Sequence, residues 1–168
     1  MQATRFLALE LLLVISYTAP PAAAADPAIM VVGPSGKTIS LTLAAIAQLP
    51  TTQLNVSYET EHGARKASFE GPLLWNALAQ LSLVDPAKER DALHEALLIT
   101  GTDGYSALLA LGEIAPAFEG KQVIIAEKMD GKPYPADQVR VVVPGDKRGG
   151  RYVRGLARIE FVTPQPGH

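Results

Sequence analysis

The sequence predicts an α+β fold in which short strands pair largely antiparallel and the helices are short. Two observations favour this class: strand-like segments outnumber segments with helical periodicity, and many of them are joined by tight turns. The 168 residues include 13 prolines and 14 glycines, a composition typical of many turns rather than of a helical bundle. With 48% hydrophobic residues, a single domain of this length can bury a sizeable core.

The first part of the chain predicts two strand pairs with a short helix between them. Four turn-forming residues, Gly33-Pro34-Ser35-Gly36, separate two apolar segments and indicate a β-hairpin. A helix follows that Ser40 or Thr42 can cap and that Pro50 ends. The expected segments are strands over 29–32 and 37–40, a helix over 41–49, and strands over 54–59 and 64–69 around His62-Gly63.

The middle of the chain contains the clearest helical pattern. Leu74, Trp75 and Leu78 recur at helical spacing after Gly71-Pro72, and a proline near a first helical turn costs little. Asp85-Pro86 indicates the start of another helix. The further segments expected here are a helix over 88–96, strands over 97–100 and 106–109 around a polar turn, and a short helix over 111–118.

Strands on either side of a cationic loop are expected in the last third. A strand over 123–127 precedes Asp130-Gly131, which is a strong two-residue turn signal. The β-branched run 139–143 then enters a Pro144-Gly145 turn, and a closing strand runs to Phe161 after the loop.

This loop has the composition of an anion-binding site. It carries four cations, Lys147, Arg148, Arg151 and Arg154, together with adjacent glycines. Backbone amides freed by glycine and forked guanidinium groups suit a phosphate or a carboxylate. The alternative is a solvated connection, since charge clusters can be structural. The net charge of -2 argues against nucleic acid as a partner, so a small anion is the expected ligand.

Residues 1–25 are typical of a secretory signal peptide, with Arg5 before an apolar stretch and small residues before Asp26. The competing interpretation is a retained membrane anchor, which the shortness of the apolar stretch before Pro20 disfavours. We therefore expect a periplasmic or secreted protein with one domain over 26–162 and a flexible tail over 163–168. The chain contains no cysteine, which excludes disulfides, thiol nucleophiles and thiolate metal ligands.

Four short segments occur in an order and spacing typical of one protein family. They are Phe69-Glu70-Gly71-Pro72-Leu73-Leu74, Thr102-Asp103-Gly104-Tyr105, Asp130-Gly131-Lys132-Pro133, and Val143-Pro144-Gly145 followed by Gly149-Gly150-Arg151-Tyr152-Val153-Arg154. In this order they resemble the molybdopterin-binding domain of the sulfite oxidase family, over roughly 41–161. The resemblance implies a sulfite-oxidase-like α+β fold with mixed, largely antiparallel sheets.

The resemblance also implies a set of ligand contacts. In that family the segment after the Val-Pro-Gly turn holds the phosphate of the pterin cofactor, which carries over to Arg151 and Arg154. Asp103 and Tyr105 lie on a loop that the resemblance places near the pocket. Trp75 is most simply a core residue; its alternative role, shared with Tyr105, is a stacking platform for the pterin ring, which contributes about 1–3 kcal/mol per ring.

One departure from the family pattern concerns the metal. Catalytic members have a molybdenum-ligating cysteine before the Gly-Pro-Leu helix start, whereas the corresponding stretch here contains Glu59, Glu61 and His62. No molybdenum is therefore expected, and a lone histidine such as His62 is usually solvated. Either glutamate can accept hydrogen bonds from the amino and ring N–H groups of a pterin.

Small exported relatives without cysteine bind pterins without molybdenum and regulate a membrane diguanylate cyclase phosphodiesterase through its periplasmic part. The chain is similar to them in size, export signal, lack of cysteine and arginine-containing loop. The resemblance thus implies a pterin-binding, ligand-responsive regulator of a membrane signalling partner, and the missing metal-ligating cysteine argues against enzymatic activity. Two alternatives stay open: a molybdopterin-dependent oxidoreductase subunit of the periplasm, and a domain that serves only as an interaction module.

Overall fold

The computed structural model describes residues 26–163, so the expected signal peptide and nearly all of the expected tail lie outside the described residues. No helix in this range is long and apolar enough to cross a membrane. The strands are β1 (Ala28–Val32), β2 (Thr38–Thr42), β3 (Thr51–Thr60), β4 (Gly63–Pro72), β5 (Ala96–Gly101), β6 (Ser106–Ala110), β7 (Ile124–Ala126), β8 (Lys128–Met129), β9 (Lys132–Pro133), β10 (Arg140–Val142) and β11 (Leu156–Val162). The helices are α1 (Leu43–Ile46), α2 (Leu74–Gln80) and α3 (Leu111–Ile114), and the 3₁₀ turns are η1 (Glu89–His94), η2 (Ala136–Gln138) and η3 (Gly149–Arg151).

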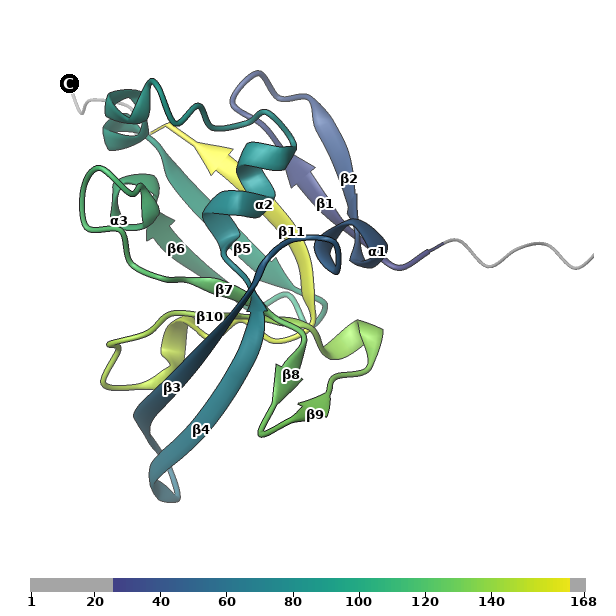
Figure 1. The fold of residues 1–168 in the computed structure, drawn as a ribbon, viewed down its shortest axis with the longest axis vertical. Coiled ribbons are helices and arrows are strands. Elements are labelled where there is room, and N and C mark those ends of the chain that lie inside the picture. The colour runs from purple at the N-terminus through teal and green to yellow at the C-terminus, as the bar shows by residue number, and fades with distance from the viewer. Residues whose placement is uncertain (1–25, 164–168) are drawn as a thin grey trace, which may run out of the picture.

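The main sheet has five strands in the order β2-β1-β11-β5-β6 (Figure 1). Its central strand, β11, pairs parallel with β1 and antiparallel with β5, so that Ile159 lies between Val31 and Ile99. Each of these three side chains is at most 1% exposed. The last strand of the domain therefore joins two hairpins, β1–β2 and β5–β6, into one sheet.

A long hairpin of β3 and β4 extends away from the main sheet and continues into β8 and β9 (Figure 1). The β8–β9 turn has positive φ at Asp130 (52°) and Gly131 (75°), the conformation that Asp-Gly favours, as the sequence predicts. Gly71 lets β4 approach β7 closely, because a Cβ there would lie 1.9 Å from the carbonyl oxygen of Ile125. The hairpin is thereby held against the core at its inner end.

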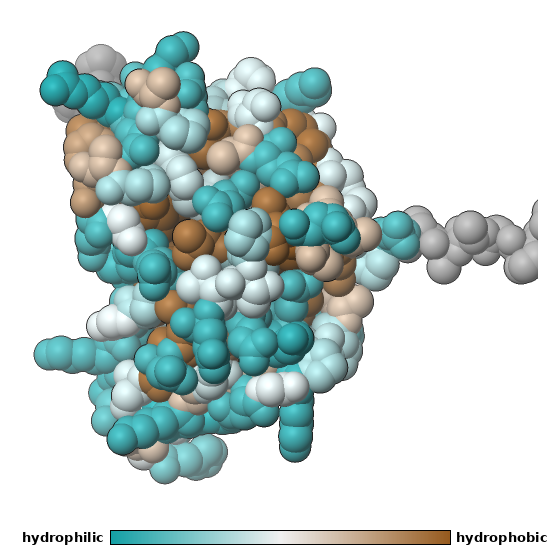
Figure 2. All heavy atoms as spheres, viewed as in Figure 1, coloured by the Kyte–Doolittle hydropathy of each residue, from teal (hydrophilic) through white to brown (hydrophobic). Residues whose placement is uncertain are grey.

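Helix α2 packs on the main sheet through the residues whose spacing predicts it (Figure 1). Leu74, Trp75 and Leu78 are 0%, 5% and 0% exposed. Helix α1 begins at Thr42, whose hydroxyl accepts a hydrogen bond from the Ala45 amide at 3.1 Å, as the capping prediction requires. In the view of Figure 2, hydrophilic residues dominate the part formed by the β3–β4 hairpin, whereas hydrophobic residues reach the surface mainly over the main sheet.

The α+β fold with largely antiparallel sheets is confirmed, and three helix predictions are corrected. The helix expected over 41–49 covers only Leu43–Ile46, because Leu41 and Thr42 still pair with β1 as part of β2. The helix expected over 88–96 is wrong: only a 3₁₀ turn forms, and Ala96 begins β5 because it pairs with Val162. The helix expected over 111–118 ends at Ile114, shortly before Pro116, which cannot continue a helical hydrogen-bond ladder. The strands that flank the cationic loop belong to different sheets, since β10 pairs with β7.

Candidate anion-binding cleft

A cleft of about 650 Å³ opens between the outer part of β3, the beginning of β10 and the loop around η3. The end of β3 meets this loop directly, because the Glu59 amide donates to the Lys147 carbonyl at 2.8 Å. The volume lies within the range of about 300–1,000 Å³ that is usual for small-molecule sites. We call it the arginine cleft; its lining residues are Tyr58, Glu59, Thr60, Glu61, Arg140, Arg148, Gly149, Gly150, Tyr152 and Arg154.

Three arginines, Arg140, Arg148 and Arg154, line the arginine cleft. None of them forms an ion pair with a carboxylate within residues 26–163. By contrast, Arg151 and Arg158 on the neighbouring segments are both paired. The three arginines outnumber the two carboxylates that line the same cleft, Glu59 and Glu61, so the cleft keeps an excess of positive charge that attracts an anion.

Arg140 is the least exposed of these cations. Its guanidinium carbon lies 4.2 Å from the centre of the Tyr134 ring, and its Nε is buried without a hydrogen-bond partner. Burial lowers the pKa of Arg140; the nearby Arg154 and Arg65 lower it further, against the opposing influence of Tyr134. A buried donor that lacks an acceptor is costly, and Arg140 has no carboxylate partner, so an anion bound in the arginine cleft would stabilise its charge.

Two tyrosines form an aromatic wall beside the arginines. The rings of Tyr58 and Tyr152 are 5.0 Å apart at 56°, and Phe69 packs edge-on against Tyr152 at 6.1 Å. Gly149 makes room for the wall, because a Cβ there would lie 3.3 Å from the Tyr58 ring. The Tyr152 hydroxyl is buried without a partner, and burial, Asp146 and Tyr58 together raise its pKa to about 12. The wall therefore consists of two tilted apolar rings, and the Tyr152 hydroxyl stays neutral.

Arg151 lies outside this lining, and its guanidinium is held by two carboxylates. Its Nε and Nη2 donate to Asp146 at 2.9 and 2.7 Å, and Nη1 donates to both oxygens of Glu113 at 3.1 Å. Hydrogen bonds from Arg151 to Asp146 are the main reason that the pKa of Arg151 is raised. The guanidinium expected to contact a ligand is thus already paired within the protein.

Tyr105 and Asp103 lie beside the loop around η3 but outside the lining of the arginine cleft. The Tyr105 hydroxyl donates to the Gly150 carbonyl, and the Tyr105 amide donates to Asp103 Oδ1 at 2.9 Å. The Tyr105 side chain touches the cleft loop without lining the cleft, and it is 51% exposed.

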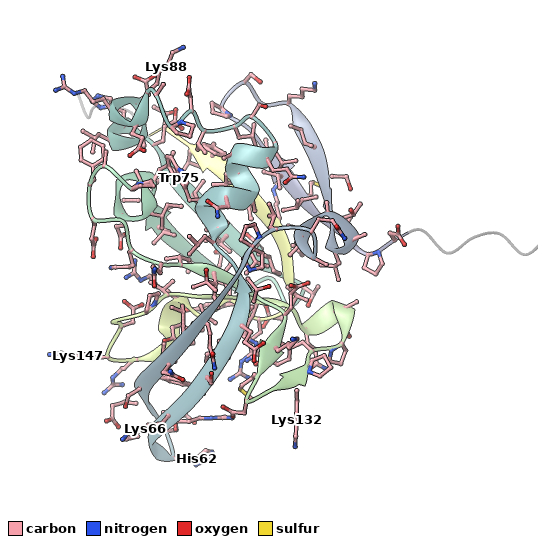
Figure 3. All side chains as sticks on the ribbon, viewed as in Figure 1. His62, Lys66, Trp75, Lys88, Lys132 and Lys147 are labelled. Carbon is pink, nitrogen blue, oxygen red and sulfur yellow. The ribbon has the colours of Figure 1, made fainter. Side chains whose placement is uncertain are left out.

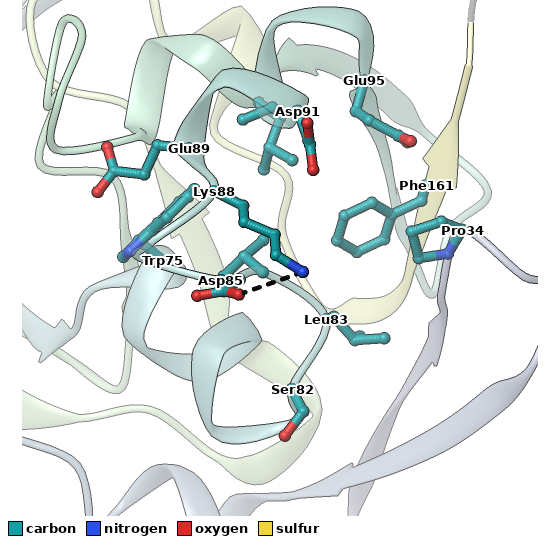
Figure 4. Close-up of a pocket in the computed structure, with 13 residues that line it drawn as sticks. Pro34, Trp75, Ser82, Leu83, Asp85, Lys88, Glu89, Asp91, Glu95 and Phe161 are labelled. Carbon is teal, nitrogen blue, oxygen red and sulfur yellow. Dashed lines mark ion pairs between the residues drawn. The ribbon is translucent and has the colours of Figure 1, made fainter.

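The remaining predicted site residues are separated. Trp75 lines another cavity, of about 310 Å³, where Asp85, Glu89, Asp91 and Glu95 surround an apolar floor (Figure 4). His62 is exposed at the tip of the β3–β4 hairpin and points away from the body of the protein (Figure 3).

Of the predicted site residues, the structure brings Arg154 and Glu61 into the arginine cleft, together with Glu59 and with Arg148 of the cationic loop. The cleft also contains Arg140, Tyr58 and Tyr152, for which the sequence predicts no role. One signal was present: Arg140 interrupts the β-branched run 139–143, where a charged side chain is unusual.

These elements and their connections define a domain with the sulfite-oxidase-like α+β fold. Among solved structures, the crystal structure of the sulfane dehydrogenase SoxCD from Paracoccus pantotrophus is similar, with a TM-score of 0.62 and 16% sequence identity. The match covers 80% of this chain and 37% of that one, so the chain spans little more than a third of its length. No protein-family model and no curated protein sequence matches the chain. At this level of identity, the likeness shows the fold alone.

Proposed function

We propose that the chain binds a pterin carrying an anionic group in the arginine cleft. We further propose that it acts in the periplasm as a ligand-responsive regulator of a membrane signalling protein. One observation supports the ligand class above all: three arginines face one cavity without a carboxylate partner in the described residues. Burial makes the charge of Arg140 costly, which adds to the stabilisation that a bound anion would provide.

The residues of the cleft fit the parts of an anionic pterin. Arg140 and Arg154 would hold the anionic group, because guanidinium forks match carboxylate and phosphate oxygens. The Tyr58–Tyr152 wall suits a planar ring, and Glu59 or Glu61 can accept hydrogen bonds from its amino and N–H groups. A bound pterin would supply this planar ring, with its donors at one edge and its charge at the other.

The chain offers no thiolate for molybdenum, since it contains no cysteine. Among residues 26–163, no group of three or more His, Asp or Glu side chains is gathered as a metal site. We therefore place the organic ligand, not a metal, at the centre of the proposal. The fold likeness to a sulfane dehydrogenase favours one competing function, a molybdopterin-dependent oxidoreductase subunit.

The ligand is tested with pterin-6-carboxylate, whose intrinsic fluorescence reports binding directly. We expect Arg154→Gln and Arg140→Gln each to weaken binding about ten-fold, as the loss of a charge-assisted contact of ~1.4 kcal/mol would do. Lys147→Gln is the matched control, because Lys147 lies on the same loop, is exposed and points outward (Figure 3). No saturable binding by the wild-type protein, or equal losses in all three variants, contradicts the proposed ligand.

The regulatory role and the oxidoreductase alternative are separated by two measurements. Metal analysis of protein purified from its host would find stoichiometric molybdenum if the oxidoreductase alternative is correct. If the chain regulates a diguanylate cyclase or phosphodiesterase, host cells carrying Arg154→Gln will differ in cyclic diguanylate from cells carrying Lys147→Gln. Equal levels in the two strains contradict the regulatory role without touching the ligand assignment.

A further inference from the structure

We propose that Arg151 and Tyr105 are positioning residues. They hold the loop around η3 from outside the arginine cleft, so that Arg148 and Arg154 face the ligand. This inference rests on the proposed function in one respect, namely that the cleft binds an anion. The attachment of the loop itself is a property of the ligand-free protein.

The first attachment is the paired guanidinium of Arg151. Asp146, earlier on the same loop, receives two hydrogen bonds from Arg151, at 2.7 and 2.9 Å. Glu113 on α3 receives both contacts from Nη1 and is also bound by Lys121 Nζ at 3.0 Å. The side chains of Arg151, Glu113 and Asp146 are 30%, 24% and 18% exposed, so water competes only partly for these hydrogen bonds. Arg151 thus closes the loop on itself and ties it to α3.

The second attachment comes from the turn between β5 and β6. The Tyr105 hydroxyl donates to the carbonyl of Gly150, which itself lines the cleft. Asp103 fixes the start of this side chain by accepting a hydrogen bond from the Tyr105 amide at 2.9 Å. The ring therefore reaches across the turn and holds the backbone of the loop at its glycine pair.

The same turn also holds the far end of the loop. The Thr102 amide donates to the Gly155 carbonyl at 2.7 Å. Gly101 allows the contact, because a Cβ there would lie 2.3 Å from the carbonyl oxygen of Arg154. Residues that do not line the cleft thus fix both ends of the segment 150–155, which carries Arg154: Tyr105 contacts Gly150 and Thr102 contacts Gly155.

These attachments matter at the part of the loop that faces the cleft. Tyr152 and Val153 are buried in the core and anchor the loop there, whereas Gly150 and Arg154 are exposed, and glycine loses more backbone entropy on ordering than other residues. Fixing the loop before the ligand arrives removes that ordering cost from binding. Positioning residues should therefore affect affinity without changing the charge that the ligand meets.

The test compares Arg151→Lys and Tyr105→Phe with Arg154→Gln, using the affinity for pterin-6-carboxylate at low and high salt. Arg151→Lys keeps the charge but loses the fork, and Tyr105→Phe loses one hydrogen bond, so we expect affinity losses of about five-fold each. Their salt dependence should match that of the wild type, whereas Arg154→Gln should bind less tightly and respond less to salt. Unchanged affinity in both Arg151→Lys and Tyr105→Phe would overturn the inference.

A second measurement is independent of any ligand. Amide hydrogen exchange over 149–154 should be faster in Tyr105→Phe and Arg151→Lys than in the wild type, while the core strand β5 keeps its protection. Lys147→Gln is again the control and should leave exchange unchanged. Unaltered exchange in both variants overturns the positioning role even if pterin binds. Faster exchange in a protein that binds no pterin would support positioning and contradict the proposed ligand.

Discussion

Replacing Tyr152 by phenylalanine tests whether the aromatic wall really contains an unsatisfied hydroxyl. Tyr152 is 8% exposed and its oxygen has no hydrogen-bond partner. Burying such a group costs about 1–3 kcal/mol, so Tyr152→Phe should leave the free energy of unfolding at pH 8 unchanged or raise it by about 1 kcal/mol.

The size of the expected difference in the free energy of unfolding follows from the ionisation of the Tyr152 hydroxyl at alkaline pH, which the variant lacks. Burial raises the pKa of Tyr152 from 10.0 to about 12, so the neutral form is favoured in the folded protein. The resulting stability is fully present below pH 10 and is lost as the pH rises through 12. By linkage, the wild type should lose about 1.4 kcal/mol more than Tyr152→Phe between pH 8 and pH 11, since other titrating groups cancel in the difference.

Urea denaturation at the two pH values measures both effects. Tyr105→Phe is the matched control: its hydroxyl donates to Gly150, so this variant should lose about 1 kcal/mol at pH 8. If Tyr152→Phe is destabilised at pH 8 by as much as the control, the Tyr152 hydroxyl has a partner and the argument for a free donor is refuted. Identical alkaline losses in wild type and Tyr152→Phe would refute the raised pKa.

Three further predictions concern the scaffold. Gly101→Ala should lower the free energy of unfolding by about 1–3 kcal/mol, because its Cβ would lie 2.3 Å from the Arg154 carbonyl oxygen. Gly131 has a φ of 75° but open space around it, so Gly131→Ala should lower the free energy of unfolding by about 1 kcal/mol in the same urea titration. Leu78→Ala, at a fully buried α2 position, should cost about 2–5 kcal/mol in thermal unfolding. Burial raises the pKa of Glu113, but hydrogen bonds from Lys121 and Arg151 outweigh burial and hold this pKa below its usual 4.5. The stability that Glu113 contributes is therefore present above pH 4.5 and is lost on acidification. Glu113→Gln should accordingly make the free energy of unfolding fall less steeply as the pH is lowered below 4.5.

Most of the local structure was predictable because it depends on neighbours in the sequence. The hairpin around Gly33–Gly36, the Thr42 cap, the α2 helix and the Asp130-Gly131 turn all appear where local patterns place them. Pairing between distant segments was not predictable in the same way. Nothing local distinguishes β10 and β11 as members of different sheets, because the choice depends on the partners β7, β1 and β5.

The sequence indicates the loop beside which the arginine cleft lies, but most of the residues predicted for the site lie outside the lining of the cleft. Composition alone indicates that the loop around 147–154 is cationic, and the cleft does form beside it. Which arginine is free depends on where carboxylates lie in three dimensions, and Glu113 reaches Arg151 from 38 residues away in the chain. Arg140 lies in a strand, and its lack of a partner likewise depends on which side chains surround it in three dimensions, so the sequence alone does not predict it.

The position of β11 in the main sheet has a consequence for how the chain folds. β11 comes after all the other described strands in the chain, yet it is the only link between the hairpins β1–β2 and β5–β6 in the described sheet. Until residues 156–162 are available, the inner edges of β1 and β5 have no partner, and unpaired edges are templates for association with other chains. The sheet therefore assembles through contacts between residues far apart in sequence, which fold slowly. A chain that stopped short of β11 would retain most of the core residues, but its main sheet would be divided into two separate hairpins.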